Sequence, residues 1–286
     1  MVVRPASAEY GIWFRRTDIE DRDNMIPAHW SAVSNTRLCT LIENNSGVTV
    51  STIEHVMAAL AGCGVHNALI EIDGPEVPAM DGSSADFVEA FVAKGFQELS
   101  APVRVIEILE AVEIEVNGAK ATLAPSDTLE IDFHIDFPDT AIGKQSKSLN
   151  MANGSFVREL CDSRTFCRKS DIEFMQQNGR ALGGDISDVV NAVVFDGDAV
   201  LSRGGLRHAD EPVRHKMLDA LGDLALAGAP IKGRYCGNRA GHAVTNKLLR
   251  ALFANPQAYR MITCSPELAD RLPGVGVKKA DLAAVA

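Results

Sequence analysis

The succession of strand-like and helix-like segments constrains the fold of this chain more than any other feature of its sequence. In the first hundred residues, alternating and β-branched stretches predict strands over 36–43, 48–50 and 67–72. One helix is predicted from a Ser51 or Thr52 cap to about Ala61. Another is predicted over 85–94, where the preceding serines can cap it.

A linker divides this region from a second one. The segment 99–102 (LSAP) is typical of a connection between folded units. Beyond it, strands are predicted over 103–108, 111–116, 119–123, 129–137 and 191–195. Asn117-Gly118 between two of these strands predicts a tight hairpin turn. The chain is therefore expected to form a first domain over 1–100 and a second over 103–286.

Helices are also predicted in the second region, over 170–179, 212–228 and 241–255. Ser170 and Glu173 have the spacing of a capping box, and Gly179 would end that helix. Pro212 fits the first turn of the next helix. Because both regions combine strands with helices, an α+β fold of two packed domains is predicted.

Composition and charge exclude several classes of protein. The net charge of −10 argues against a nucleic-acid partner. No run of eighteen apolar residues is present, which argues against a membrane span, and the first residues do not resemble a secretory signal. The six cysteines show no CxxC spacing and indicate reduced thiols. A cytoplasmic protein is expected.

His215 and Asp219 are the first candidates for chemistry. Four residues apart in a predicted helix, they lie on one face and can bind one metal ion. A histidine such as His55 would complete a three-ligand site with an open position, the arrangement of catalytic zinc. Glu54 would then stand where a base for the metal-bound water is needed. Such pairs also arise by chance, and Glu54-His55 alone is equally typical of an exposed helix surface.

Several other polar and aromatic residues could have either a functional or a purely structural role. His242 at the start of a helix could donate a proton with Asp223 as its carboxylate partner, or it could be a surface histidine. Phe137 at a strand end could stack on a flat base, although such residues usually close a core. Lys216 and Arg239 could bind substrate or be solvated.

Longer motifs occur in order along nearly the whole chain. They are 51–55 (STIEH), 78–83 (PAMDGS), 163–166 (SRTF), 181–184 (ALGG), 210–223 (DEPVRHKMLDALGD), 241–243 (GHA) and 246–247 (NK). Together they resemble one family, the zinc-dependent UDP-3-O-acyl-N-acetylglucosamine deacetylases (LpxC) of lipid A biosynthesis. Metallopeptidases and nucleoside deaminases are disfavoured because the chain lacks HExxH and HxE…PCxxC.

The resemblance implies a role for each matching residue. The implied zinc ligands are His55, His215 and Asp219. The implied catalytic residues are Glu54 as general base, His242 as general acid, Asp223 as the partner of His242, and Thr165 as an oxyanion stabiliser. The implied substrate contacts are Lys216, Phe166, the uracil-stacking Phe137, and Arg239, where some relatives carry lysine.

The resemblance also implies a fold and a reaction. Each domain would pair a sheet with helices in a β-α-α-β sandwich. A small βαβ insert near 165–195 would surround the acyl chain, with Ile172, Phe174 and Met175 as apolar contacts. The reaction would be the zinc-dependent release of acetate from an acylated UDP-sugar. A cytoplasmic enzyme without a membrane span, active as a monomer, is expected.

One departure from the family pattern generates an alternative. Family members begin with a further strand and a Gly-x-Gly-Leu-His-x-Gly-like turn ahead of the segment that matches residues 3–6. Either the start codon is misassigned or the chain is a truncated form with an unpaired sheet edge. The alternative function is therefore an inactive remnant that binds zinc or a UDP-sugar. The presence of all the matched catalytic residues favours the enzyme.

Overall fold

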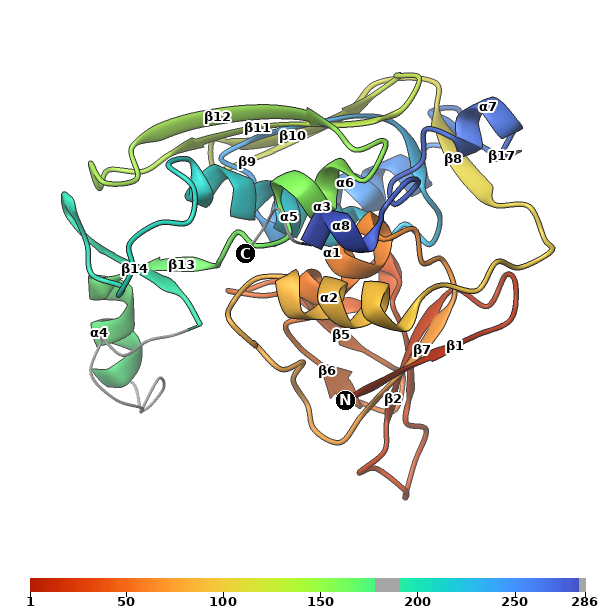
Figure 1. Cartoon of the computed structure of the whole chain (residues 1–286), viewed down its shortest axis with the longest axis horizontal. Coiled ribbons are helices and arrows are strands. Elements are labelled where there is room, and N and C mark those ends of the chain that lie inside the picture. The colour runs from red at the N-terminus through yellow and green to blue at the C-terminus, as the bar shows by residue number, and fades with distance from the viewer. Residues whose placement is uncertain (178–190, 283–286) are drawn as a thin grey trace.

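Two β-sheets enclose a layer of helices (Figure 1). The computed structural model describes residues 1–177 and 191–282. Helix α1 (Glu54–Gly62) and helix α5 (Glu211–Ala225) contact each other in the middle of the molecule. The larger sheet covers the α5 side, at the top of Figure 1, and the smaller sheet lies on the α1 side. The predicted α+β fold of layered sheets and helices is confirmed.

The smaller sheet has the strand order β1-β7-β2-β3. Its strands are β1 (Val2–Pro5), β7 (Ala68–Ile72), β2 (Ile12–Arg16) and β3 (Met25–Pro27). Strand β2 runs parallel to β7, whereas β1 and β3 pair antiparallel with their neighbours. Within the described residues β1 is an edge strand of this sheet.

A second, three-stranded sheet precedes α1. It comprises β4 (Val33–Asn35), β5 (Leu41–Glu43) and β6 (Thr49–Val50). The prediction of one strand over 36–43 is wrong in its first part. Leu38 has a φ of 73°, a left-handed conformation that interrupts an extended strand.

The predicted cap of α1 is also wrong. Ile53 is the N-cap residue and no side chain caps the helix. Thr52 has a φ of 58°, and its hydroxyl donates to Glu76 at 2.7 Å.

Helix α2 (Ala85–Lys94) has the predicted bounds. The Ser84 hydroxyl does not cap α2 but donates to the carbonyl of His55 at 2.8 Å, which links α2 to α1.

The larger sheet has seven strands. They are β8 (Arg104–Ile108), β9 (Val112–Val116), β10 (Ala119–Ala124), β11 (Leu129–Asp136), β12 (Lys144–Asn150), β16 (Ile231–Asn238) and β17 (Tyr259–Thr263). Strand β16 lies between β10 and β11, antiparallel to the first and parallel to the second. Asn117 and Gly118 have φ values of 52° and 76°, so the predicted hairpin turn is confirmed. The division into domains at 99–102 stays a prediction.

A β-α-β unit projects from this body, at the left of Figure 1. Strand β13 (Phe166–Arg168) runs parallel to β14 (Val193–Asp196), helix α4 (Lys169–Gln177) lies between them in sequence, and β15 (Ala199–Val200) pairs with β14. Helix α4 already includes Lys169, so the capping box predicted at Ser170 is wrong. Gly179 and the motif 181–184 lie outside the described residues.

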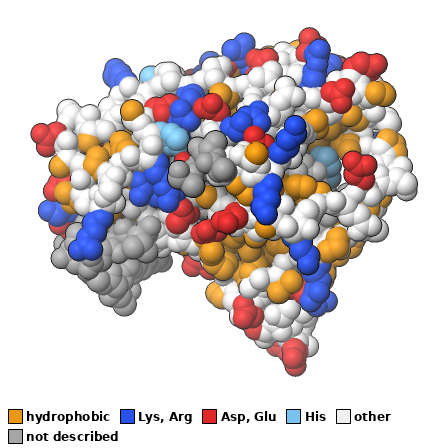
Figure 2. Space-filling view, viewed as in Figure 1, with side chains coloured by type: hydrophobic (Ala, Val, Ile, Leu, Met, Phe, Trp, Pro, Cys, Tyr) orange, Lys and Arg blue, Asp and Glu red, His pale blue; other side chains and the backbone are white. Residues whose placement is uncertain are grey.

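The remaining helices are α3 (Ser155–Glu159), α6 (His242–Ala254), α7 (Pro266–Ala269), α8 (Lys279–Leu282) and the 3₁₀ helix η1 (Trp30–Ala32). None of the helices in the described ranges is long and apolar enough to cross a membrane. Figure 2 shows basic and acidic side chains interspersed over one face of the molecule.

Gly222 brings the backbones of α1 and α5 into close contact. A Cβ atom added at this position would lie 2.1 Å from the carbonyl oxygen of Glu54. Any side chain here would therefore push the first turn of α1 away from α5. Glu54 and His55 belong to that turn, so this glycine sets the distance between α1 and the polar residues of α5.

We predict that Gly222→Ala lowers the free energy of unfolding by about 1–3 kcal/mol, the usual cost of overpacking. The direction of this change tests the close contact, because alanine in place of glycine normally stabilises a helix where there is room for the methyl group. Gly74→Ala is the control, since a Cβ there meets nothing within 4 Å. Urea unfolding of both variants checks this, and unchanged stability of Gly222→Ala would contradict the close contact.

Candidate metal and catalytic site

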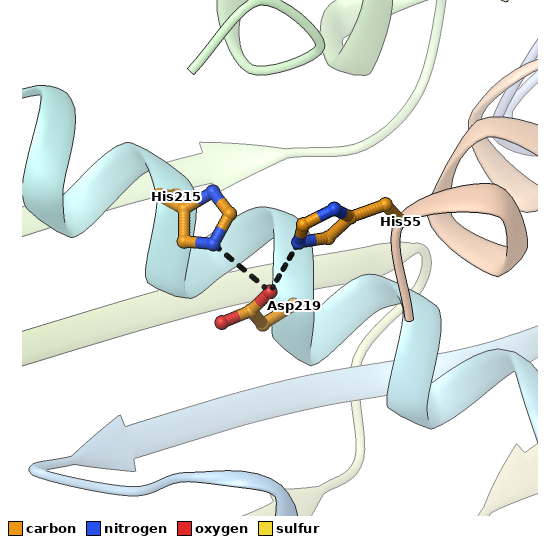
Figure 3. Close-up of side chains that lie close together, drawn as sticks. All are labelled: His55, His215 and Asp219. Atoms are coloured by element: carbon orange, nitrogen blue, oxygen red, sulfur yellow. Dashed lines mark ion pairs between the residues drawn. The ribbon is translucent and has the colours of Figure 1, made fainter. Parts of the chain in front are cut away.

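Helices α1 and α5 bring together the three predicted metal ligands (Figure 3). His215 and Asp219 lie one turn apart on α5, with 3.3 Å between His215 Nε2 and Asp219 Oδ1. His55, the second residue of α1, places its Nε2 atom 3.7 Å from the same oxygen. One candidate ligand atom from each residue lies within 4.8 Å of the other two, and all three residues are buried.

The donor set fits a divalent metal ion. Asp219 Oδ1 is buried and has no hydrogen-bond partner among residues 1–177 and 191–282, which is costly unless a cation binds it. Burial lowers the pKa of His55 to about 3 and also lowers the pKa of His215, so both imidazoles are neutral donors near pH 7. His215 Nδ1–H donates to the carbonyl of Ser163 at 3.0 Å, which leaves Nε2 facing the aspartate. Two nitrogens and one oxygen are typical ligands of catalytic zinc.

Lys216 stabilises the charged form of the aspartate. Its Nζ donates to Asp219 Oδ2 at 2.6 Å. Burial favours the neutral form of Asp219, but His215 and Lys216 outweigh it and hold the pKa of this carboxyl well below its usual range. The side chain therefore stays a carboxylate, with one oxygen paired to Lys216 and the other facing the histidines.

A chain of polar side chains adjoins the three ligands. His242, the first residue of α6, donates from Nδ1 to Asp223 Oδ2 at 2.8 Å. Its other ring nitrogen, Nε2, lies 3.9 Å from Glu54 Oε1. The structure thus brings the predicted base, the predicted acid and the partner of the acid to one side of the ligand cluster.

The two groups that face each other have shifted pKa values. Burial raises the pKa of Glu54 to about 7. Burial lowers the pKa of His242, but the charge and hydrogen bond of Asp223 outweigh it and raise the pKa to about 9. Near pH 8 one group can accept a proton and the other can donate one, which is the requirement for acid–base catalysis.

The predicted aromatic contacts lie beside His215. The Phe166 ring is 6.3 Å from the His215 ring and 5.4 Å from Phe137, edge-on in both cases. Thr165 directly precedes Phe166. Its amide donates to the carbonyl of Gly82, and its carbonyl accepts from the amide of Val193, each at 2.7 Å. Phe166 and Phe137 therefore form an apolar wall against one ligand.

The Arg239 guanidinium contacts a turn of the larger sheet, and one further residue beside the cluster, Thr40, was not predicted. The Arg239 guanidinium donates to the carbonyl of Gly118 at 2.7 Å, in the β9–β10 turn. Thr40, which no motif marked, binds both Glu54 and Asp223. Both contacts join segments that are far apart in the sequence, so the residues around Thr40 give no pattern from which they could be predicted.

Comparison with known proteins agrees with the motifs and the site. The family model described as LpxC, UDP-3-O-acyl N-acetylglycosamine deacetylase, matches residues 1–254. This chain belongs to the LpxC family. The predicted resemblance is thereby confirmed.

Several UDP-3-O-acyl-N-acetylglucosamine deacetylases are similar to the chain. The one from Phenylobacterium zucineum is 48% identical over 270 residues, which cover 94% of this chain and 91% of the relative. The Shewanella woodyi protein is 43% identical over 263 residues, covering 91% and 85% respectively. The Pasteurella multocida protein is 42% identical over 265 residues, covering 92% and 86%.

A buried ion pair holds the SRTF motif of this LpxC chain against α5. Glu211, only 1% exposed, accepts hydrogen bonds from the Arg164 amide at 3.0 Å and from its guanidinium at 2.9 and 3.1 Å. It also accepts from the amide of Arg207 at 2.7 Å. Burial raises the pKa of Glu211, but these donors outweigh it and lower the pKa from its ordinary value.

We predict that Glu211→Gln destabilises the protein by about 3–5 kcal/mol at neutral pH, because it removes the counter-charge of the Arg164 guanidinium, whose side chain is only 11% exposed. The wild-type pair contributes stability above the unfolded pKa of 4.5 and loses it as the pH falls through the lower folded pKa. The variant should lack this acid-dependent loss. Urea unfolding at a series of pH values measures it, with Glu98→Gln, at an exposed position, as the control. Parallel pH curves for Glu211→Gln and wild type would refute the assignment.

Proposed function

We propose that this chain is a zinc-dependent deacetylase that hydrolyses the acetamide of UDP-3-O-acyl-N-acetylglucosamine and releases acetate, the committed step of lipid A biosynthesis. The observation that carries the proposal is the unpartnered Asp219 oxygen that faces two neutral histidines beside an acid–base pair. The family and the names of the relatives support the substrate.

His55, His215 and Asp219 would hold the zinc ion. When bound there, zinc would polarise the acetamide carbonyl and lower the pKa of a water molecule. Lys216 is proposed to contact the substrate, beside its ion pair with Asp219. The Phe166 ring lies next to His215, with Phe137 packed against Phe166.

The proton transfers fall to residues of the chain itself. Glu54 accepts a proton from the attacking water as the carbon–oxygen bond forms. The hydroxyl of Thr165 would donate to the developing oxyanion. His242 then protonates the nitrogen as the carbon–nitrogen bond breaks, and Asp223 holds its ring during the transfer. The products are acetate and the free amine.

The remaining predictions concern substrate and setting. Phe137 is proposed to stack on uracil and Arg239 to contact the diphosphate. The β13–α4–β14 unit is proposed to surround the acyl chain, where Ile172 is buried. The side chains of Phe174 and Met175 lie outside the part of the chain that the structure describes. A monomer in the cytoplasm stays the expected form.

The inactive-remnant alternative predicts no acetate release, whereas the proximity of Glu54, His242 and Asp223 to the predicted ligands supports the enzyme. We expect wild-type protein to bind one zinc ion and to release acetate from the acylated UDP-sugar. Glu54→Ala and His242→Ala should each lower kcat by about 10²–10⁴-fold, the usual contribution of a general base or acid. Both variants should retain zinc, because neither residue is a proposed ligand.

Two comparison variants sharpen this test. His134→Ala, on the outer face of the larger sheet, should keep wild-type turnover. His215→Ala should lose most of its zinc as measured by elemental analysis. Near-normal kcat in Glu54→Ala or His242→Ala would refute the acid–base assignment, and full zinc content in His215→Ala would refute the ligand assignment.

The pH dependence of the reaction should report the Asp223–His242 pair. His242 must be protonated to act as the acid, so activity is expected to fall as the pH rises through about 9. Asp223→Asn removes the largest negative charge that raises the pKa of His242, while burial still lowers it, so the alkaline limb should move to lower pH. Profiles of kcat/KM for both proteins check this, and an unmoved alkaline limb would contradict it.

A further inference from the structure

Thr40 connects the two carboxylates that flank the proposed site. Its backbone N–H donates to Glu54 Oε2 at 3.0 Å, and its hydroxyl donates to Asp223 Oδ1 at 2.6 Å. The residue is only 1% exposed and lies 183 positions from Asp223 in the chain. A single residue from the first half of the chain therefore binds the base and the partner of the acid.

Each hydrogen bond occupies the oxygen that faces away from His242. The other oxygen of Glu54, Oε1, lies 3.9 Å from His242 Nε2. The other oxygen of Asp223, Oδ2, accepts from His242 Nδ1 at 2.8 Å. The last torsion of a carboxylate side chain is soft, so a donor at one oxygen determines where the second oxygen points.

The backbone of Thr40 is itself tied to α1. Its carbonyl accepts from the amide of Ile53, the N-cap residue, at 3.4 Å. The amide, the hydroxyl and the carbonyl of Thr40 thus all form hydrogen bonds. These bonds hold the residue between the start of α1 and the face of α5. A shift of Thr40 would move both carboxylates together.

We propose that Thr40 is a positioning residue that holds the base Glu54 and, through Asp223, the acid His242 in a fixed mutual orientation. This inference rests on the proposed function. The simpler interpretation is a buried hydroxyl whose hydrogen bond is only structural, such as the Thr128 hydroxyl, which accepts from Asn150 Nδ2 at 2.8 Å. Loss of either hydroxyl should lower stability, whereas only loss of the Thr40 hydroxyl should impair turnover.

The decisive comparison is between Thr40→Ser and Thr40→Ala, which differ in one oxygen atom. We expect kcat to fall about 10–100-fold in Thr40→Ala and in the isosteric Thr40→Val, since small misplacements of catalytic groups have effects of this size. KM and zinc content should change less than about threefold, because these depend on other groups. Thr40→Ser should recover kcat to within about threefold of wild type. Thr128→Val is the control and should keep wild-type kcat.

Coupling to Asp223 gives a second measurement. If Thr40 acts through Asp223, the Thr40→Ala/Asp223→Asn double variant should lose little more activity than Asp223→Asn alone. Fully multiplicative losses would overturn the inference. So would equal kcat values for the serine and alanine variants.

A spectroscopic measurement separates this inference from the proposed function. The proton of the His242 ring that is shared with Asp223 should give a downfield NMR resonance in wild type and Thr40→Ser. The resonance should be shifted or lost in Thr40→Ala. Absence of acetate release by wild type would refute the proposed function, and the resonance would still decide the role of Thr40. An identical resonance in all three proteins would overturn the positioning role.

Discussion

The close contact between α1 and α5 at Gly222 is the constraint on which the site depends. His55 belongs to the first half of the chain, whereas His215 and Asp219 belong to the second. Because Gly222 has no side chain, the Glu54 backbone lies directly against α5. His55 consequently reaches the same Asp219 oxygen that His215 faces. The three-ligand cluster is thus a product of helix packing rather than of any local loop.

Several ionisable groups are buried where the helices meet, which is unfavourable unless their charges are paired. Lys216 offsets Asp219, and the histidine ligands are neutral because burial lowers their pKa values. Asp223 offsets His242, whose pKa is raised to about 9. Among the described residues, Asp219 Oδ1 has no hydrogen-bond partner, and a bound cation would offset the cost of burying it.

Sequence reasoning succeeded where the signal is local. Helix α2 has its predicted bounds because an apolar helical pattern follows turn-forming serines, and Asn117-Gly118 forms the predicted turn because both residues accept positive φ. The i, i+4 pair on α5 was predictable for the same reason. Local signals misled at Thr52, which adopts positive φ and binds Glu76 instead of capping α1. Thr40 could not be predicted, because its function depends on a partner 183 residues away.

The segment 163–166 connects the projecting β-α-β unit to the three predicted metal ligands. The Ser163 carbonyl fixes the ring of His215, and Arg164 anchors the segment to Glu211 at the start of α5. The next residues lead into β13 of the projecting unit, with Phe166 against His215. This four-residue segment therefore connects the projecting unit directly to His215, one of the predicted ligands. Because Ser163 holds the His215 ring and Phe166 packs against it, a displacement of the segment would change the surroundings of that ring.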